Sequence, residues 1–434
     1  MKFLIVSVAG LGWRDLKQRK LTRLAGLDFS SAESAFPALT CVSQASLRTG
    51  LKPVKHGMVS NAHFSRALQR PMFWEQSAAL IKGKRIWEAA RNRDETLGVA
   101  LFFFQQSLGE TADLILSPAP IHKHHGGMIE KLYVTPPVLD AEIGKANLKF
   151  PLKFYWGPLA DAFAGELVLN HVEYTIDFAD PEISFVYLPT LDYDLQRHGP
   201  DSVKADEAFR ALEKQLARLA EFAKKTGREL VVIGEYGITQ VTEPPVFPNV
   251  TLRKFGHFKT REVNGMWYPD FYASNAFAVC DHEIAHVYVK DSEDLGLLQF
   301  VFETSGEYDV VERRAKQNWA HASAGELLLV AKQGSWCAYP WWDEDKQAPE
   351  YATHVDIHNK PGYDPCELFF GRLIPPGTSL DWGKVKGTHG RECEVALAST
   401  VPLPDLPPFP CMDDVGVALN KAFKEVKSED EDER

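Results

Sequence analysis

The sequence predicts an α/β fold in which a mostly parallel sheet lies between two layers of helices. Three runs of strand length, at residues 3–8, 183–188 and 230–233, are mainly apolar and rich in β-branched residues. Such runs are typical of strands that are buried on both faces of a parallel sheet. An amphipathic helix precedes the third run, because large apolar residues recur there at three- and four-residue spacing: Phe209, Leu212, Leu216, Leu219 and Phe222. The strand–helix–strand unit predicts a right-handed parallel crossover.

The remaining apolar patterns extend this fold and divide the chain. We expect further strands at residues 97–104, 285–289 and 327–331, and helices at 86–93, 293–303 and 415–426. Residues 105–180 combine many aromatic residues and prolines with little periodicity, so we expect a loop-rich insertion that caps the sheet. We place a single domain at residues 1–410, then a C-terminal helix at 411–427 and an acidic, disordered tail at 428–434.

Composition narrows the classes of function. The net charge of −11 argues against a nucleic-acid duplex as the main partner. The six cysteines include no closely spaced pair, which argues against a disulfide framework and a zinc–thiolate site. The first apolar run is short and leads to Trp13, Arg14 and Asp15 without a cleavage pattern, so we interpret it as a strand. No apolar run has the length of a membrane span, and we expect a cytoplasmic protein that does not bind a membrane.

A hydroxyl residue, Thr40, follows a proline-containing segment and precedes a short run that can be helical and ends at Thr49-Gly50. A hydroxyl at a helix N-terminus lies beside unpaired N–H groups at the positive end of the helix dipole. That position suits a nucleophile that attacks an anionic phosphorus or sulfur centre. The alternative is that Thr40 is an ordinary helix cap.

Other polar residues follow predicted strands. Asp192 and Glu235 come directly after two of the buried runs, and Asp356 and His358 stand in a later polar loop. Open parallel sheets place their sites outside the carboxyl ends of the strands, so we expect these groups near Thr40. Carboxylates, an imidazole and a hydroxyl suit a divalent cation that assists a nucleophile. Each residue also has a structural alternative: a turn aspartate, a salt-bridged glutamate or a loop histidine.

The order of these motifs is recognisable along most of the chain. They are Thr40, Thr49-Gly50, His56-Gly57 and Asn61; then Leu191-Asp192, Gln196 and Gly199-Pro200; then Glu235-Tyr236-Gly237; and finally His358 before Gly362-Tyr363-Asp364. With this order the chain resembles the nucleotide pyrophosphatase/phosphodiesterase branch of the alkaline phosphatase superfamily, over roughly residues 2–395. The resemblance implies a three-layer α/β/α sandwich of the alkaline-phosphatase type. It also implies a metal-dependent hydrolase that cleaves a phosphodiester or pyrophosphate bond of a small substrate with Thr40 as nucleophile.

The chain departs from that family at four metal-ligand positions and at one supporting position. Ala9 or Gly10 replaces an aspartate, Gln196 replaces a histidine, and Glu235-Tyr236 replaces an Asp-His pair. Ser43 stands where the family often has an asparagine that supports the transition state, so we assign it a catalytic role. We therefore expect fewer than two tightly bound zinc, manganese or magnesium ions. The expected ligands are Asp192, Glu235 and His358, assisted by Gln196 or Asp356, and Tyr236 is expected to donate a hydrogen bond to the substrate phosphate.

Two alternative functions stay open. One is a catalytically altered family member that binds a phospho-ligand without hydrolysis, and the other is a phosphomutase or phosphonate hydrolase on the same core. Two further histidine motifs are interpreted as structural. His389 lies in a Gly-Thr-His-Gly loop, and the triplet of Asp281, His282 and His286 runs into a predicted strand, where a histidine is more often packed than ligating.

Overall fold

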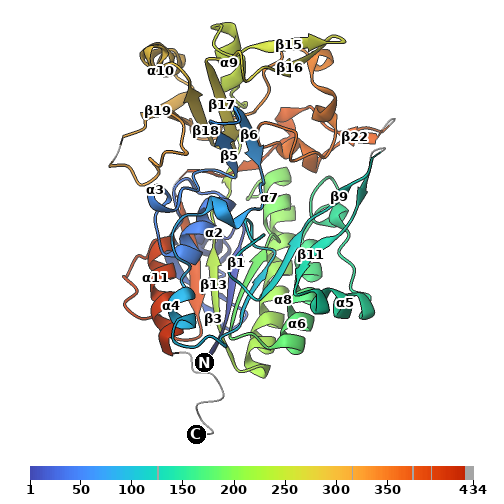
Figure 1. Cartoon of the computed structure of the whole chain (residues 1–434), viewed down its shortest axis with the longest axis vertical. Coiled ribbons are helices and arrows are strands. Elements are labelled where there is room, and N and C mark those ends of the chain that lie inside the picture. Colours follow the sequence, from blue (N-terminus) through green and yellow to red (C-terminus); the bar gives the residue numbers. More distant parts are fainter. Residues whose placement is uncertain (125–126, 315, 374–375, 392, 426–434) are drawn as a thin grey trace.

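The computed structural model describes residues 1–124, 127–314, 316–373, 376–391 and 393–425. Its main sheet has eight strands in the order β11-β8-β7-β12-β1-β13-β24-β4, and the five from β8 to β13 in that order are mutually parallel (Figure 1). In chain order the strands are β1 (Lys2–Val8), β4 (Ser30–Glu33), β7 (Val99–Phe102), β8 (Leu114–Pro118), β11 (Leu132–Thr135), β12 (Ile183–Leu188), β13 (Arg228–Gly234) and β24 (Glu394–Ser399). The predicted α/β fold with a mostly parallel sheet is confirmed.

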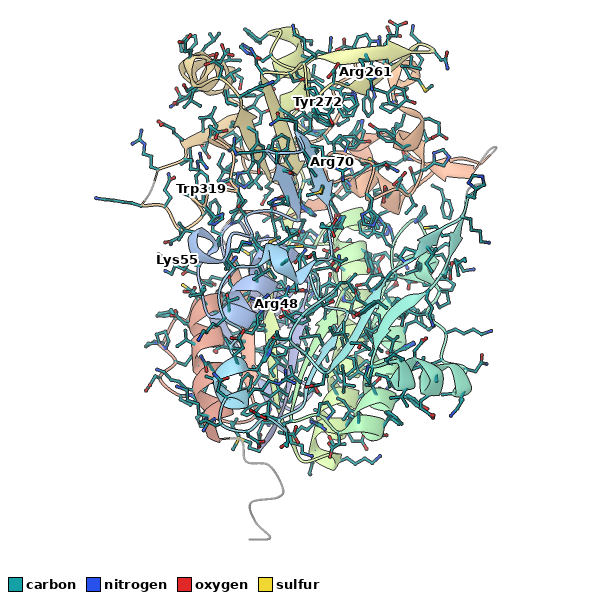
Figure 2. All side chains as sticks on the ribbon, in the orientation of Figure 1. Arg48, Lys55, Arg70, Arg261, Tyr272 and Trp319 are labelled. Atoms are coloured by element: carbon teal, nitrogen blue, oxygen red, sulfur yellow. The ribbon has the colours of Figure 1, made fainter. Side chains whose placement is uncertain are left out.

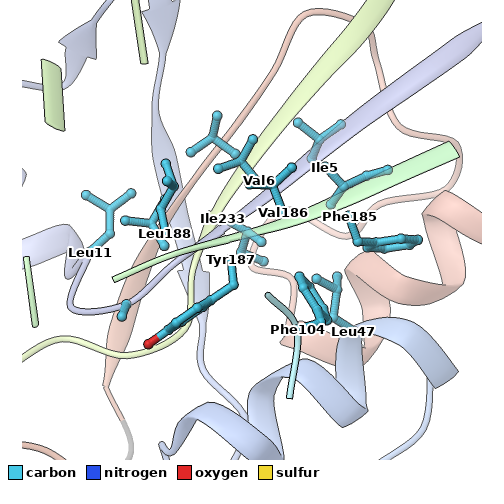
Figure 3. Packing of buried hydrophobic residues seen from close by; sticks show 14 of the residues in the cluster. Ile5, Val6, Leu11, Leu47, Phe104, Phe185, Val186, Tyr187, Leu188 and Ile233 are labelled. Carbon is cyan, nitrogen blue, oxygen red and sulfur yellow. The ribbon is translucent and has the colours of Figure 1, made fainter. Parts of the chain in front are cut away.

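Strand β1 lies between β12 and β13 and forms the centre of the core. Ile5 is opposite Phe185 on one side and Val231 on the other, and all three side chains are fully buried (Figure 3). Apolar side chains on both faces of a strand require a helical layer on each face. Those layers are α6 (Phe163–Ala179) and α8 (Val203–Lys225) on one side, and α2 (Thr40–Thr49) and α11 (Met412–Ala422) on the other (Figure 1).

Residues 105–180 differ from the expected loop-rich insertion. They supply strands β8 and β11 of the main sheet and helices α5 (Pro137–Lys145) and α6. Two of the prolines that suggested a loop, Pro136 and Pro137, stand at the start of α5, where a missing N–H and a fixed φ are compatible with a helix. Strand β8 is a short apolar run that is buried within the main sheet. Its sequence has no periodicity that would have identified it as a strand.

A second, antiparallel sheet lies above the main one and was not predicted as a separate unit (Figure 1). Its strands are β17 (Ala276–Asp281), β18 (Ile284–Val289), β20 (Leu327–Ala331) and β19 (Tyr308–Glu312), in that spatial order. It has its own apolar core, to which α10 (Leu295–Ser305) contributes Leu298 and Phe302. The tight turn between β17 and β18 points toward the main sheet and supplies a residue to the site described below.

Helix α2 is buried along its whole length and is held at both ends. Near its C-terminus Arg48, which is fully buried, donates to the carbonyl groups of Gln105 and Gln106 (Figure 2). Helix α11 packs so closely on α2 that a Cβ at Gly416 would lie 2.4 Å from the Leu47 carbonyl oxygen. This packing fixes the helix that begins at Thr40.

Part of the predicted C-terminus is observed. Helix α11 falls within the predicted terminal helix, whereas the predicted acidic tail lies outside the described residues. Within the ranges that the structure describes, no helix combines the length and the apolar composition that crossing a bilayer requires.

Candidate active site

A cavity of about 390 Å³ lies between the carboxyl ends of the main-sheet strands and the second sheet. Thr40, Asp192 and Tyr236 line its floor from the main sheet side, and His282 reaches it from the turn between β17 and β18. The topology explains this convergence, since Asp192 follows β12 and Tyr236 follows β13, and these two strands run parallel on either side of β1. Of the polar residues expected to meet at this sheet edge, Thr40 and Asp192 lie together on the floor, and Tyr236, which follows Glu235, joins them.

Thr40 is the first residue of α2, after Leu39 in an extended conformation. Its side chain is almost completely buried, and its hydroxyl oxygen lies 3.2 Å from the hydroxyl oxygen of Tyr236. The amide of Cys41, the next residue, donates to the side-chain oxygen of Asn61 at 3.0 Å. Thr40 is therefore fixed at the N-terminus of a buried helix, where the positive end of the helix dipole faces the cavity.

A chain of hydrogen bonds runs from Thr40 across the cavity floor. Tyr236 donates to one carboxylate oxygen of Asp192 at 3.0 Å, and Gln196 donates to the other at 2.9 Å. Tyr363 in turn donates to the side-chain oxygen of Gln196 at 2.7 Å. We call Thr40, Tyr236, Asp192, Gln196 and Tyr363 the floor chain. Both oxygens of the Asp192 carboxylate accept hydrogen bonds from protein donors within it.

Burial raises the pKa of Asp192 to about 6, against the lowering effect of its hydrogen bonds from Gln196 and Tyr236. Asp192 begins helix α7 (Asp192–His198), and Gln196 follows one turn later on the same face, which explains their contact. A carboxylate with a pKa near 6 is mainly ionised at neutral pH and remains basic enough to accept a proton. Asp192 therefore has the properties of a general base.

Glu235 is fully buried beside the floor chain. One of its carboxyl oxygens accepts hydrogen bonds from Ser7 at 2.7 Å and Gln44 at 2.8 Å, and the other has no hydrogen-bond partner. Burial raises the pKa of Glu235 to about 8, although the hydrogen bonds from Ser7 and Gln44 lower it. At pH 7 the group is therefore mainly a neutral carboxylic acid, which can donate a hydrogen bond.

Four rings form a continuous stack beside the floor chain. The ring centroids of Tyr236 and His389 are 3.6 Å apart, with an angle of 4° between the ring planes. The centroid of His389 is 3.7 Å from that of His282, which is 3.6 Å from that of Tyr363. His389 is anchored by a hydrogen bond of 2.8 Å between its Nδ1 and the Ala38 carbonyl oxygen. The stack fixes the orientation of the Tyr236 ring, whose hydroxyl contacts Thr40.

His282 enters the stack from an unusual backbone conformation. Its φ of +59° lies in the left-handed region, which residues other than glycine rarely adopt. Its Nδ1 is 2.8 Å from the Asp281 carboxylate, which also accepts hydrogen bonds from Ser60 at 2.7 Å and from the Asn61 backbone at 2.7 Å. Since Asn61 also contacts Cys41, this network links the second sheet to the start of α2.

The site contains residues that the sequence analysis interpreted as structural. His282 and His389 line the cavity, and so does Tyr363, which appeared only as part of a motif. The glycines on both sides of the Thr388-His389 pair could have indicated in the sequence that His389 belongs to the site, because such loops bring a side chain close to another backbone. His286 was correctly interpreted as packed: it is buried in β18 and its Nε2 is 2.9 Å from the Val59 carbonyl oxygen.

The predicted metal ligands do not come together. His358 lies on the exposed side of the cavity, with its Nδ1 3.2 Å from the Phe73 carbonyl oxygen, and Asp356 accepts a hydrogen bond from Asn359 at 2.7 Å. Across the described ranges, no group of three or more His, Cys, Asp or Glu residues is arranged to hold a metal ion. Tyr236 and Gln196 donate to the two oxygens of Asp192 and His358 stands apart from it, so the predicted ligand set stays a prediction that this arrangement does not support.

Ser43 also has a different contact from the one predicted. Its hydroxyl donates to the backbone carbonyl of Glu235 at 2.9 Å, one turn into α2, and it is fully buried. Ser43 therefore attaches α2 to the end of β13. The predicted catalytic role of its hydroxyl is not supported by this geometry.

The cavity wall above the floor is mainly aromatic and apolar. The ring centroid of Trp156 lies 6.0 Å from those of both Tyr193 and Tyr363, and that of Trp74 lies 6.5 Å from that of Tyr363. Among the lining residues that the structure describes, Lys153 is the only lysine, and no arginine lines the cavity. Such a wall suits an apolar or ring-shaped substituent of a ligand.

A buried ion-pair cluster supports one side of this wall. Lys360 lies 2.7 Å from both Asp364 and Glu367, and all three side chains are buried. Glu367 also accepts hydrogen bonds from the backbone of Asp356 at 2.9 Å and from the indole of Trp156. Lys360 therefore neutralises two carboxylates, one of which, Glu367, holds the wall segment and Trp156 in place.

Replacing Lys360 with methionine is expected to lower the free energy of unfolding by about 3 kcal/mol, because two buried carboxylates lose their cation. Urea denaturation at pH 7 measures this change. Lys332→Met is the matched control, since Lys332 and Asp309 form an exposed ion pair whose loss is expected to change stability by less than about 1 kcal/mol. Equal effects of the two substitutions would contradict a supporting role for Lys360.

Comparisons with known proteins agree with this architecture. The family model described as type I phosphodiesterase/nucleotide pyrophosphatase matches residues 3–364. The structure is similar to that of murine ectonucleotide pyrophosphatase/phosphodiesterase 5, with a TM-score of 0.60 and 13% identity over 98% of this chain and 95% of that one. It is also similar to phosphonoacetate hydrolase from Sinorhizobium meliloti 1021 in complex with phosphonoacetate, with a TM-score of 0.61 and 15% identity over 98% and 96% of the two chains.

No curated protein matches the chain in sequence. The two structural likenesses, at such low identity, concern the fold. The family model covers most of the chain, including Thr40, Asp192 and Tyr236. The chain therefore belongs to the type I phosphodiesterase/nucleotide pyrophosphatase family and is, by family, a phosphodiesterase- or pyrophosphatase-like hydrolase.

Proposed function

We propose that this protein hydrolyses a phosphodiester or pyrophosphate bond in a small substrate, with Thr40 as nucleophile and Asp192 as general base acting through Tyr236. One observation carries the proposal. The Thr40 hydroxyl lies at the start of a buried helix on the cavity floor, 3.2 Å from a tyrosine hydroxyl that itself donates to a carboxylate with a pKa of about 6. This arrangement joins a nucleophile to a base by an intervening hydroxyl.

The proposed first step transfers one proton along the floor chain. The Thr40 proton passes to the Tyr236 oxygen while the Tyr236 proton passes to Asp192. The Thr40 oxygen forms a bond to phosphorus as the bond between phosphorus and the leaving oxygen breaks, and the leaving group departs with that electron pair. The oxygen of a water molecule then forms a bond to the phosphorus of the phosphothreonine as the bond between phosphorus and the Thr40 oxygen breaks. Asp192 returns its proton to the Thr40 oxygen through Tyr236, which regenerates the threonine. One proton of the water stays on the released phosphate group and the other passes to solvent.

Two groups are placed to stabilise the phosphoryl oxygens in this proposal. The N-terminus of α2 supplies a positive dipole end, and neutral Glu235 has a carboxyl oxygen without a partner. A neutral acid that donates a hydrogen bond avoids the repulsion that a second carboxylate would exert on the phosphate. Because the described residues do not form the predicted metal-ligand set, no step of this mechanism uses a metal.

Tyr236→Phe tests the proposal, because it keeps the ring stacked on His389 and removes only the hydroxyl. We expect kcat/KM for an aryl phosphodiester, such as bis(4-nitrophenyl) phosphate, to fall by about 100-fold, the usual contribution of a positioned proton-transfer group. The control is Tyr193→Phe, a cavity tyrosine whose hydroxyl donates to the Tyr155 carbonyl and is expected to matter less than about threefold. Undiminished activity of Tyr236→Phe would refute the proton route.

A second candidate function is binding of a phospho-ligand without hydrolysis. The observation that favours it is the scarcity of cations on the cavity lining, where Lys153 is the only lysine or arginine among the described residues. An inactive variant of the murine structural neighbour is in complex with AMP, and the bacterial neighbour with phosphonoacetate. Calorimetry with AMP and phosphonoacetate, followed by product analysis, separates the two functions: binding of unchanged ligand supports this candidate.

A further inference from the structure

We infer that this active site takes no catalytic metal ion, and that the Tyr236 hydroxyl occupies the position between Thr40 and Asp192 in which a cation would contact both. The absence of a metal goes beyond the proposed function, whereas the catalytic role of the Tyr236 hydroxyl rests on that function. It is drawn from how the side-chain atoms are used in the floor chain.

The first argument concerns the atoms that would bind a cation. Asp192 accepts from Tyr236 on one oxygen and from Gln196 on the other, at 3.0 and 2.9 Å. Gln196 turns its N–H₂ group toward Asp192 and its oxygen toward Tyr363. A donor group at this place repels a cation, and the only acceptor atom of Gln196 is already used. A metal would have to displace two well-formed hydrogen bonds.

The second argument concerns charge. Asp192 and Glu235 are both buried, yet no lysine or arginine within the described part of the chain lines the cavity floor beside them. Neutral donors contact these carboxyl groups instead: Tyr236 and Gln196 donate to the two oxygens of Asp192, and Ser7 and Gln44 donate to one oxygen of Glu235. The oxygens that would bind a cation are therefore largely used by neutral hydrogen-bond donors.

The third argument concerns the ring stack. Tyr236 lies flat against His389, which packs on His282, and the His389 Nδ1 is held by the Ala38 carbonyl. The Tyr236 ring therefore has a fixed plane, and its hydroxyl meets Thr40 and Asp192 together. Moving this ring to admit an ion would break its stacking on His389 as well as both hydrogen bonds.

The test measures metal in the full-length protein, purified without chelator, by elemental analysis. We expect less than about 0.1 equivalent of zinc, manganese or magnesium per chain, where a structural or catalytic site would hold close to one. Addition of each metal, or of EDTA, is expected to change the melting temperature by less than about 1 °C and aryl phosphodiester hydrolysis by less than about twofold.

A variant that restores ligand chemistry provides the positive control. Gln196→His, Glu235→Asp and Tyr236→His are combined in one chain, because these changes replace two donor groups by imidazoles and bring back an Asp-His pair. We expect this variant to bind zinc in titrations and to gain thermal stability with zinc, whereas wild type does neither. Its folding without metal is checked by circular dichroism, and if it does not fold, the metal content and the EDTA response of wild type decide the question.

The outcomes separate this inference from the proposed function. Stoichiometric metal in wild type, or loss of hydrolysis in EDTA with recovery on adding metal, would overturn the inference while leaving Thr40 as the proposed nucleophile. A wild-type protein that contains no metal and gains neither stability nor activity from any metal supports the inference. If that protein also hydrolyses nothing, the proposed hydrolysis fails and the inference of a metal-free site stands.

Discussion

Replacing Thr40 with alanine is expected to lower the hydrolysis of an aryl phosphodiester by at least about a thousandfold, since the variant lacks the attacking oxygen. The substitution removes one hydroxyl that contacts Tyr236 and leaves the rest of α2 buried. Release of 4-nitrophenolate under substrate-saturating and limiting conditions gives kcat and kcat/KM separately. Because chemistry rather than binding is affected, kcat is expected to carry most of the loss.

Two variants control for this effect. Thr49→Ala removes a hydroxyl at the other end of the same helix, where it donates to the Ala45 carbonyl at 2.6 Å, and is expected to retain activity within about threefold. Thr40→Ser keeps a hydroxyl and is expected to be impaired far less than Thr40→Ala. If the alanine variants at both positions are equally active, Thr40 is not the nucleophile and serves only to begin the helix.

Replacing Glu235 with glutamine is expected to stabilise the protein at alkaline pH. The pKa of Glu235 is raised from 4.5 to about 8 in the folded state, so the folded protein binds a proton more tightly than the unfolded chain does. The contribution of this group to stability is therefore complete below pH 4.5 and is lost as the pH rises through about 8. Glutamine does not ionise, so the variant avoids this loss, which amounts to about 5 kcal/mol above pH 8.

The measurement is urea denaturation of wild type and Glu235→Gln between pH 5 and pH 9. The difference in unfolding free energy is expected to grow with pH up to about pH 8 and to level off above it. Glu221→Gln, on the exposed face of α8, is the control and is expected to give a small difference that does not change with pH. A difference for Glu235→Gln that stays constant with pH would mean that this carboxyl group is ionised in the folded protein at neutral pH.

The parallel core was predictable because burial on both faces is visible in the residues themselves. Strands β1, β12 and β13 are mainly apolar, and the crossover helix α8 has a clear 3.6-residue pattern. From these elements it follows that residues after the strands share one edge of the sheet. This reasoning grouped Thr40 with Asp192, 152 residues further along the chain, and both residues line the cavity.

The second sheet and its contribution were not predictable by the same means. Strands β17 to β20 pair in an antiparallel sheet through contacts between distant segments, and no local pattern says which strands pair. His282 joins the site because a two-residue turn between β17 and β18 places it there in a left-handed conformation. A histidine next to a strand gives no sign of that conformation in the sequence, so it was interpreted as structural.

Residue type alone does not show how an atom is used, so the sequence could not say whether the predicted metal ligands share one site. Asp192 is a typical ligand by type, but in the folded protein both its oxygens accept hydrogen bonds from Tyr236 and Gln196. His358 has the right chemistry and lies at the exposed side of the cavity, whereas His389 is stacked within it. The departures from the family pattern at Gln196 and Tyr236 were visible in the sequence, and the structure gives them a common purpose as donors to Asp192.

Covalent labelling of Thr40 tests the central claim most directly. A phosphonate diester with two 4-nitrophenol groups is attacked by the same nucleophile, which releases one nitrophenolate and leaves a stable phosphonyl group on the protein. We predict one adduct per chain, located by peptide mass spectrometry on the segment that contains Thr40, with labelling slowed in Tyr236→Phe and abolished in Thr40→Ala. An adduct on another residue, or nitrophenolate release that persists unchanged in Thr40→Ala, would contradict a threonine nucleophile in this site.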